Sequence, residues 1–184
     1  MYNTVDAALL YIVTVYELYK RTEDIDFINE AWPVMVSIIA NYIKGTDYSI
    51  KLDSDGLITA GASIDTVTWM DARCGDVTPT SRHGKPVEIN AYWYNCLTIM
   101  DIFKKELGKS DEYLKVNDYS DKAKNRVRMS LESINGTLRE GCIGQIAEIY
   151  DGLRPVSSRG CFAQAWSVGE ILKVYDALEG NYGF

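Results

Sequence analysis

Helical spacing of apolar residues sets the strongest limit on how this chain folds. Near the N-terminus, apolar side chains recur every three or four residues, at Val5, Leu9, Ile12, Val13 and Tyr16. This spacing places them on one face of a helix. Asn3 and Asp6 suit the start of that helix, because capping residues and early acids stabilise helix N-termini. We therefore predict a helix over residues 4–20.

A second helical segment is predicted to follow a short turn. Asp26 is suited to cap that turn, which runs through Trp32. Pro33 then fits the first turn of a longer helix, where its missing N–H group is not needed. Gly45 is expected to end this helix.

Three more amphipathic segments occupy the rest of the chain. One follows Pro86, one covers residues 119–135, and one follows a loop that ends at Gly160. Because no segment shows convincing strand alternation, the predicted fold class is all-α. The pattern alone leaves a bundle, a solenoid and a helical toroid as alternatives.

Two long loops separate the helices, at residues 46–87 and 140–160. The first is rich in Asp, Gly, Ser, Thr and Pro, and loops of this length are usually functional or disordered. It also carries apolar residues that gain by burial, namely Ile58, Ile64, Val67 and Trp69. We therefore predict a structured active-site loop with a short strand.

Charge and hydropathy limit the partners of the chain. Its 19 basic and 26 acidic residues give a net charge of −7, the wrong sign for binding nucleic acid or an anionic membrane. Apolar runs such as residues 7–15 end well before the roughly 18 residues of a membrane span, and no signal peptide is visible. With 47% hydrophobic residues, the 184 positions are expected to form one cytoplasmic domain.

Few residues are available for nucleophilic or metal chemistry. Cys74, Cys96, Cys142 and Cys161 lack CxxC spacing, which favours buried or incidental thiols over a metal site. His83 is the single histidine, so a Ser-His-Asp mechanism would depend on one loop residue. Carboxylates are therefore the main candidates for acid and base chemistry.

Several sequence strings carry a family resemblance. Residues 67–72 read Val-Thr-Trp-Met-Asp-Ala, and residues 84–95 read Gly-Lys-Pro-Val-Glu-Ile-Asn-Ala-Tyr-Trp-Tyr-Asn. Further strings occur in the expected order: Tyr-Asn-Thr-Val-Asp-Ala at 2–7, Glu-Ile-Tyr-Asp-Gly at 148–152 and Gly-Cys-Phe-Ala-Gln-Ala-Trp-Ser at 160–167. Over almost the whole chain, the sequence resembles the amylo-α-1,6-glucosidase domain of the glycogen debranching enzyme family.

The resemblance implies an (α/α)6 toroid with its active-site loops at one end. Because about five or six helices are readable, residues 1–184 are expected to be a single domain, the C-terminal half of that toroid. The implied reaction is hydrolysis of α-1,6-linked glucosyl branch residues of glycogen or related α-glucans with inversion, releasing glucose without metal or cofactor. The chain alone is expected to be inactive. The N-terminal half or a second copy is expected to cover the open flanks.

Inverting glycoside hydrolysis needs one carboxylic acid and one carboxylate base. The resemblance assigns these roles to Asp71 and Glu148. The Trp69-Met70 pair is expected to desolvate the Asp71 carboxyl group partly, and a solvent-exposed capping Asp is the alternative. For Glu148 the alternative is structural hydrogen bonding, and Glu88 is the fallback base.

Sugar binding requires directed hydrogen bonds and flat apolar faces. The expected sugar-binding residues are Asp6, Trp69, Lys85, Glu88, Gln164 and Trp166. For Glu88 the alternative is stabilisation of a helix start. Trp93 and Trp166 both lie on helical stripes, where core packing is the common explanation.

Two other functions fit the same residues. Two carboxylates do not define the linkage, so a glucoamylase-like or trehalase-like inverting α-glucosidase is one alternative. A non-catalytic glucan-binding fragment is the other.

Overall fold

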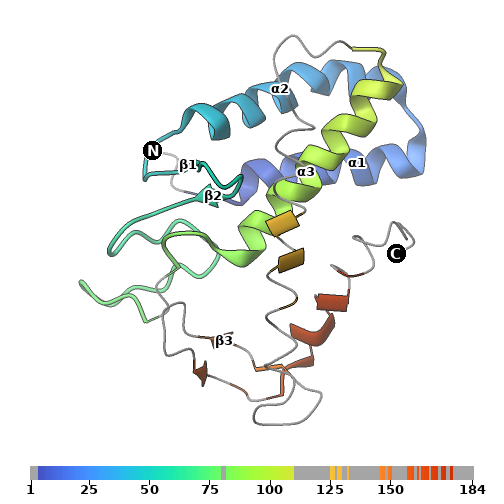
Figure 1. Cartoon of the computed structure of the whole chain (residues 1–184). Helices are drawn as coiled ribbons and strands as arrows, with labels where there is room; N and C mark the ends of the chain where they lie inside the picture. The colour runs from blue at the N-terminus through green and yellow to red at the C-terminus, as the bar shows by residue number, and fades with distance from the viewer. Residues whose placement is uncertain are drawn as a thin grey trace. The chain divides into compact units, whose positions relative to one another are not determined.

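The computed structural model describes residues 4–79 and 82–109, together with positions 125, 126, 128, 129, 132, 146, 147, 149, 150, 157–159, 161, 163–165, 167–169, 171, 172 and 175 (Figure 1). The chain divides into two compact units, Met1–Ala123 and Lys124–Phe184. Among the described residues, no helix combines the length and the apolar character that crossing a bilayer requires.

The first helix, α1 (Ala7–Thr22), lies close to its predicted position. Its buried residues are Leu9, Ile12 and Val15. The helix ends at Glu23, which has φ +53° and donates its N–H to the Tyr19 carbonyl oxygen at 2.8 Å. Lys20 and Arg21 in the last turn favour this end through the helix dipole.

The second helix, α2 (Ile25–Lys44), corrects the prediction for this region. It is one continuous helix in which Pro33 is an interior residue, and it is capped by Asp24 instead of Asp26. The Asp24 carboxylate accepts a hydrogen bond from the Phe27 N–H at 2.9 Å. An interior proline frees the carbonyl four residues earlier. Pro33 and Asn29 are both exposed, so water can satisfy that carbonyl without breaking the helix.

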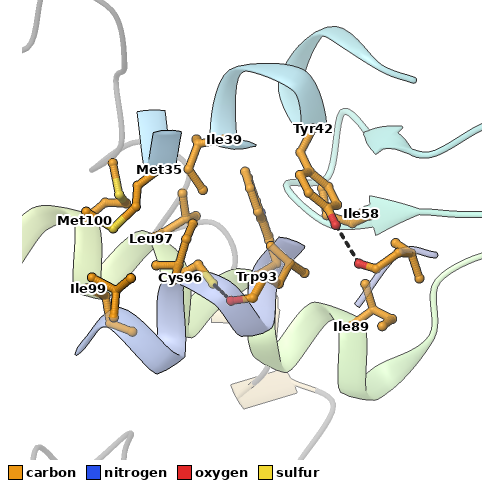
Figure 2. Packing of buried hydrophobic residues seen from close by; sticks show 14 of the residues in the cluster. Met35, Ile39, Tyr42, Ile58, Ile89, Trp93, Cys96, Leu97, Ile99 and Met100 are labelled. Atoms are coloured by element: carbon orange, nitrogen blue, oxygen red, sulfur yellow. Dashed lines mark hydrogen bonds between the residues drawn. The ribbon is translucent and has the colours of Figure 1, made fainter. Parts of the chain in front are cut away.

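The third helix, α3 (Val87–Glu106), begins directly after Pro86, as predicted. It packs mainly against α1, where the Phe103 ring makes edge-to-face contacts with Tyr16 and Tyr19 at centroid distances of 5.8 and 5.4 Å. Buried side chains of α2 and α3 also point toward one another in Figure 2, among them Met35, Ile39, Tyr42, Trp93, Leu97 and Met100. The three helices therefore share one hydrophobic core, which supports the all-α class.

The segment between α2 and α3 is structured, as predicted. It contains a two-stranded antiparallel hairpin, β1 (Lys51–Leu52) and β2 (Ile58–Thr59), with Lys51 opposite Thr59. Ile58 is fully buried in the helical core. The strands are two residues long, so helices remain the main elements of this unit.

The second unit contains another short hairpin, β3 (Ile149–Tyr150) paired antiparallel with β4 (Ser158–Arg159). The described positions from 165 to 175 are helical, in agreement with the predicted final helix. Of the helix predicted at 119–135, positions 125, 126, 128, 129 and 132 are helical. The remainder of that helix, and Cys142, lie outside the described residues.

Candidate active site

The start of α1 is fixed to the long loop through Val5. The Val5 N–H donates to the Val67 carbonyl oxygen at 2.8 Å, and the Tyr42 hydroxyl donates to the Val5 carbonyl oxygen at 2.5 Å. Burial raises the pKa of Tyr42, and nearby Cys96 and Asp6 add to the effect, so the hydroxyl remains a donor. Asp6 is thereby held beside the string that carries Asp71.

The loop becomes exposed to solvent shortly after the Val5–Val67 hydrogen bond. Val67 and Thr68 are buried, and the Thr68 hydroxyl oxygen accepts from the Met70 N–H at 3.3 Å. Trp69 is 62% exposed, and Asp71 is exposed. The expected desolvation of Asp71 by its apolar neighbours is therefore absent. The reason is that the Trp69 ring faces solvent and leaves the neighbouring carboxyl group open to water.

A tight turn forms the tip of the loop. Cys74 and Val77 exchange two backbone hydrogen bonds of 2.9 and 3.0 Å around Gly75 and Asp76. Gly75 has φ +61°, which a first central turn residue of the type II′ class requires. Residues 71–77 are all exposed, so this tip makes no contribution to the core.

The chain returns to the hairpin at Gly84. Ala60 and Gly84 exchange backbone hydrogen bonds of 2.7 and 2.9 Å. The buried Asn90 side chain also binds the backbone of Ile58. Its Oδ1 accepts a hydrogen bond from the Ile58 N–H at 2.6 Å, and its Nδ2 donates one to the Ile58 carbonyl oxygen at 3.1 Å. The second string, residues 84–95, which runs into the first turns of α3, is therefore fixed to β2.

Lys85 is engaged by two carboxylates of the hairpin. Its ammonium group lies 2.7 Å from Oδ2 of Asp53 and 2.7 Å from Oδ2 of Asp55. Hydrogen bonds from Lys85 and from the Ser54 amide lower the pKa of Asp53. Burial opposes ionisation of Asp55, but hydrogen bonds from Lys85 and Leu57 outweigh it and lower that pKa too.

The same balance acts on Lys85 itself. Burial opposes its charged form, but the hydrogen bonds to Asp53 and Asp55 outweigh burial and raise its pKa. An ammonium group has three N–H donors, and these contacts use two of them. Sequence reasoning missed both aspartates, although an Asp-Ser-Asp-Gly turn is typical of a hairpin that presents carboxylates.

Glu88 lies in the first turn of α3 and pairs with Arg82, which sequence reasoning also missed. Arg82 Nη2 donates to Glu88 Oε2, and Arg82 Nη1 lies 4.0 Å from the Met70 sulfur. The guanidinium group therefore links the start of α3 to the residue directly before Asp71. The sequence offered only one hint of this pair, an arginine six positions before Glu88. That spacing alone does not predict a contact, because the path of the loop brings the two side chains together.

The remaining candidates belong to the second unit. The Gln164 N–H donates to the Ile146 carbonyl oxygen at 2.9 Å, which places Gln164 beside the residues that precede Glu148. Glu148 and Trp166 lie outside the described residues. Within the described part of the chain, no group of three or more His, Cys, Asp and Glu side chains is arranged to hold a metal ion.

The structure thus defines an all-α protein whose first unit presents carboxylates and an exposed tryptophan on a loop anchored to a helical core. The profile of a protein family described as amylo-alpha-1,6-glucosidase matches residues 1–114 and 110–173. The chain therefore belongs to the amylo-α-1,6-glucosidase family, in agreement with the resemblance of its sequence strings. No curated protein and no solved structure matches the chain.

Proposed function

We propose that this chain takes part in hydrolysing α-1,6-linked glucosyl residues at branch points of glycogen or related α-glucans, releasing glucose. The observation that carries the proposal is the family match, which covers both strings of the anchored loop region. In this proposal residues 1–184 form one domain, a partial (α/α)6 toroid equal to the C-terminal half of the catalytic domain. The helical hairpin of α1 and α2 supports such an architecture.

In the proposed reaction, Asp71 is the general acid and Glu148 the general base. Asp71 donates a proton to the glycosidic oxygen while the bond to the anomeric carbon breaks. A water molecule attacks that carbon from the opposite face, and Glu148 accepts its proton. This geometry requires the two carboxyl groups to lie roughly 6.5–9.5 Å apart. Because Asp71 is exposed, the bound sugar and other segments must exclude water from it.

The proposed sugar-binding groups come from both units and are proposed residue by residue. Trp69 offers an exposed indole face, in contrast to Trp93, which is fully buried in the core as its helical position predicts. Asp6 accepts a hydrogen bond from the Thr4 hydroxyl and has further acceptor capacity for a sugar hydroxyl. Lys85 contributes its third N–H. Gln164 and Trp166 complete the set from the second unit.

One observation favours a glucan-binding role without catalysis as a second candidate. The exposure of Trp69 and Asp71 allows this chain to contact a glucan without enclosing the scissile bond. A glucoamylase-like or trehalase-like activity is the remaining enzymatic alternative, and it differs only in the linkage that the site accepts.

A substrate panel tests these candidates. The chain is assayed for glucose release from isomaltose, maltose, trehalose and branched limit dextrin, alone and after mixing with a separately expressed N-terminal half of a family domain. We expect release from the α-1,6-linked substrates in the mixture only. Saturable glycogen binding without release in either sample supports the binding role, and preferential cleavage of maltose or trehalose contradicts the proposed linkage.

A groove on the first unit suits the proposed covering of the toroid flank. It has a volume of about 570 Å³ and runs along α2, with Pro33, Val34 and Ile38 among its lining residues. Val34 is 50% exposed, so it offers apolar surface to a partner that occupies this groove. We propose the N-terminal half as the occupant. Light scattering of the chain alone distinguishes this from a homo-oligomer, which would replace that half with a second copy.

A further inference from the structure

Arg82 and Glu88 form a partly buried ion pair whose geometry is incomplete. Their side chains are 23% and 21% exposed, and the contact joins Arg82 Nη2 to Glu88 Oε2. Within the described residues, the neighbouring atoms Arg82 Nε and Glu88 Oε1 are buried and have no hydrogen-bond partner. One donor and one acceptor of the same pair are therefore left unused.

In a side-on fork between guanidinium and carboxylate, these two atoms would form the second contact. A buried donor or acceptor without a partner costs free energy, so the open contact favours a group that satisfies both atoms. A hydroxyl group does so, because it accepts from Nε through its oxygen and donates its own hydrogen to Oε1. Sugar rings present such hydroxyls.

The position of Arg82 relates this pair to the proposed acid. Its Nη1 lies against the Met70 sulfur, and Met70 is the residue before Asp71. The Ala60–Gly84 bridge fixes the backbone two residues after Arg82. Methionine has an unbranched and adaptable side chain, so this contact leaves the guanidinium group room to adjust.

We infer that Arg82 and Glu88 act as one hydroxyl-binding pair, in which Arg82 both positions the Glu88 carboxylate and donates Nε–H to a hydroxyl of the glucosyl ring. This inference rests on the proposed function, because it names an α-glucoside as the ligand. It goes beyond helix-dipole stabilisation by Glu88, which would require neither Arg82 nor an open donor beside it.

Isomaltose titration of the full chain, followed by calorimetry and NMR, tests the pair. Arg82→Lys keeps the positive charge but removes Nε, so we expect roughly tenfold or greater loss of affinity with little change in Tm. Glu88→Gln should weaken binding similarly. Lys105→Gln removes an exposed pair with Asp101 at the far end of α3 and should bind like the wild type. In the wild type, the Arg82 Nε–H signal should shift during titration.

The outcomes separate the inference from the proposed function. Wild-type affinity in Arg82→Lys, or an Arg82 Nε–H signal that isomaltose leaves unmoved while binding occurs, overturns the inference and leaves the proposed function intact. Absence of isomaltose binding both by the wild-type chain alone and by its mixture with the separately expressed N-terminal half contradicts both. If Arg82→Lys also lowers Tm, its loss of affinity no longer separates binding from folding. The inference then depends on whether isomaltose shifts the Arg82 Nε–H signal of the wild type.

Discussion

The helical core and the loop between α2 and α3 are stabilised by different interactions. The core is held by apolar side chains of three helices that are almost completely buried. The loop is held at a few points by hydrogen bonds and ion pairs, at Val67, Gly84, Lys85 and Asn90, while its tip is exposed. Apolar packing therefore determines the stability of the first unit. The hydrogen bonds and ion pairs at these four residues, the anchors of the loop, determine where the proposed site residues lie.

The largest effect expected in the loop concerns activity. Asp71→Asn should lower glucose release by the chain, mixed with an N-terminal half, by about 10²- to 10⁴-fold, because it removes the proposed general acid. Asp76→Asn is the matched control, since Asp76 is a highly exposed carboxylate on the same loop whose ion pair with Arg73 spans 3.5 Å. Near-normal turnover in Asp71→Asn contradicts the assignment.

Two tryptophans test the contrast in stability. Trp93→Ala should lower the free energy of unfolding by about 3–5 kcal/mol, because it empties a fully buried position and loses the hydrogen bond to the Gly56 carbonyl at 3.2 Å. Trp69→Ala should change it by less than about 0.5 kcal/mol. Instead it should weaken isomaltose binding by roughly three- to tenfold. Urea denaturation and calorimetry measure both, and equal destabilisation would remove the distinction between core and loop.

The anchors should have intermediate effects. Asn90→Ala leaves the buried N–H and C=O groups of Ile58 without their partner, so we expect a loss of about 2–4 kcal/mol. Amide hydrogen exchange at Ile58 should accelerate more than exchange in α1. Asn95→Ala, at an exposed position of the same helix, should have little effect. Unchanged exchange at Ile58 in Asn90→Ala would show that packing alone holds the hairpin.

The smallest effect expected is that of the ion pairs at Lys85, and it depends on pH. The pKa values of Asp53 and Asp55 are lowered in the folded protein, so their contribution is present above the ordinary value near 4 and is lost as the pH falls through the lower folded values. The Tm difference between wild type and Lys85→Met should therefore shrink below about pH 4. A difference that persists in acid would contradict this account.

The contrast also explains how far sequence reasoning reached. Helix positions followed from spacing, because burial imposes that spacing on residues such as Leu9 and Ile12. Pro33 misled the prediction for α2, since an exposed proline can be tolerated where the freed carbonyl meets water. The Val5–Val67 contact joins backbone atoms and so leaves no side-chain signature.

For the site, the strings name candidate residues, and their assignment to catalysis and sugar binding stays a prediction. Asp6 and the Asp71 loop lie together, and Lys85 and Glu88 lie where the second string places them, on an anchored helix start. Their partners Asp53, Asp55 and Arg82 depend on the path of the loop, which local propensity does not determine. The pairing of Asp71 with Glu148 stays a prediction, because Glu148 lies outside the described residues.

The configuration of the released glucose tests the central claim most directly. Proton NMR is recorded during the first minutes after the chain, mixed with an N-terminal half, is added to branched limit dextrin, before mutarotation equilibrates the anomers. Attack of water on the face opposite the leaving group, with Asp71 and Glu148 as acid and base, predicts that β-glucose appears first. Initial formation of α-glucose would contradict the inverting mechanism and the roles assigned to both carboxylates.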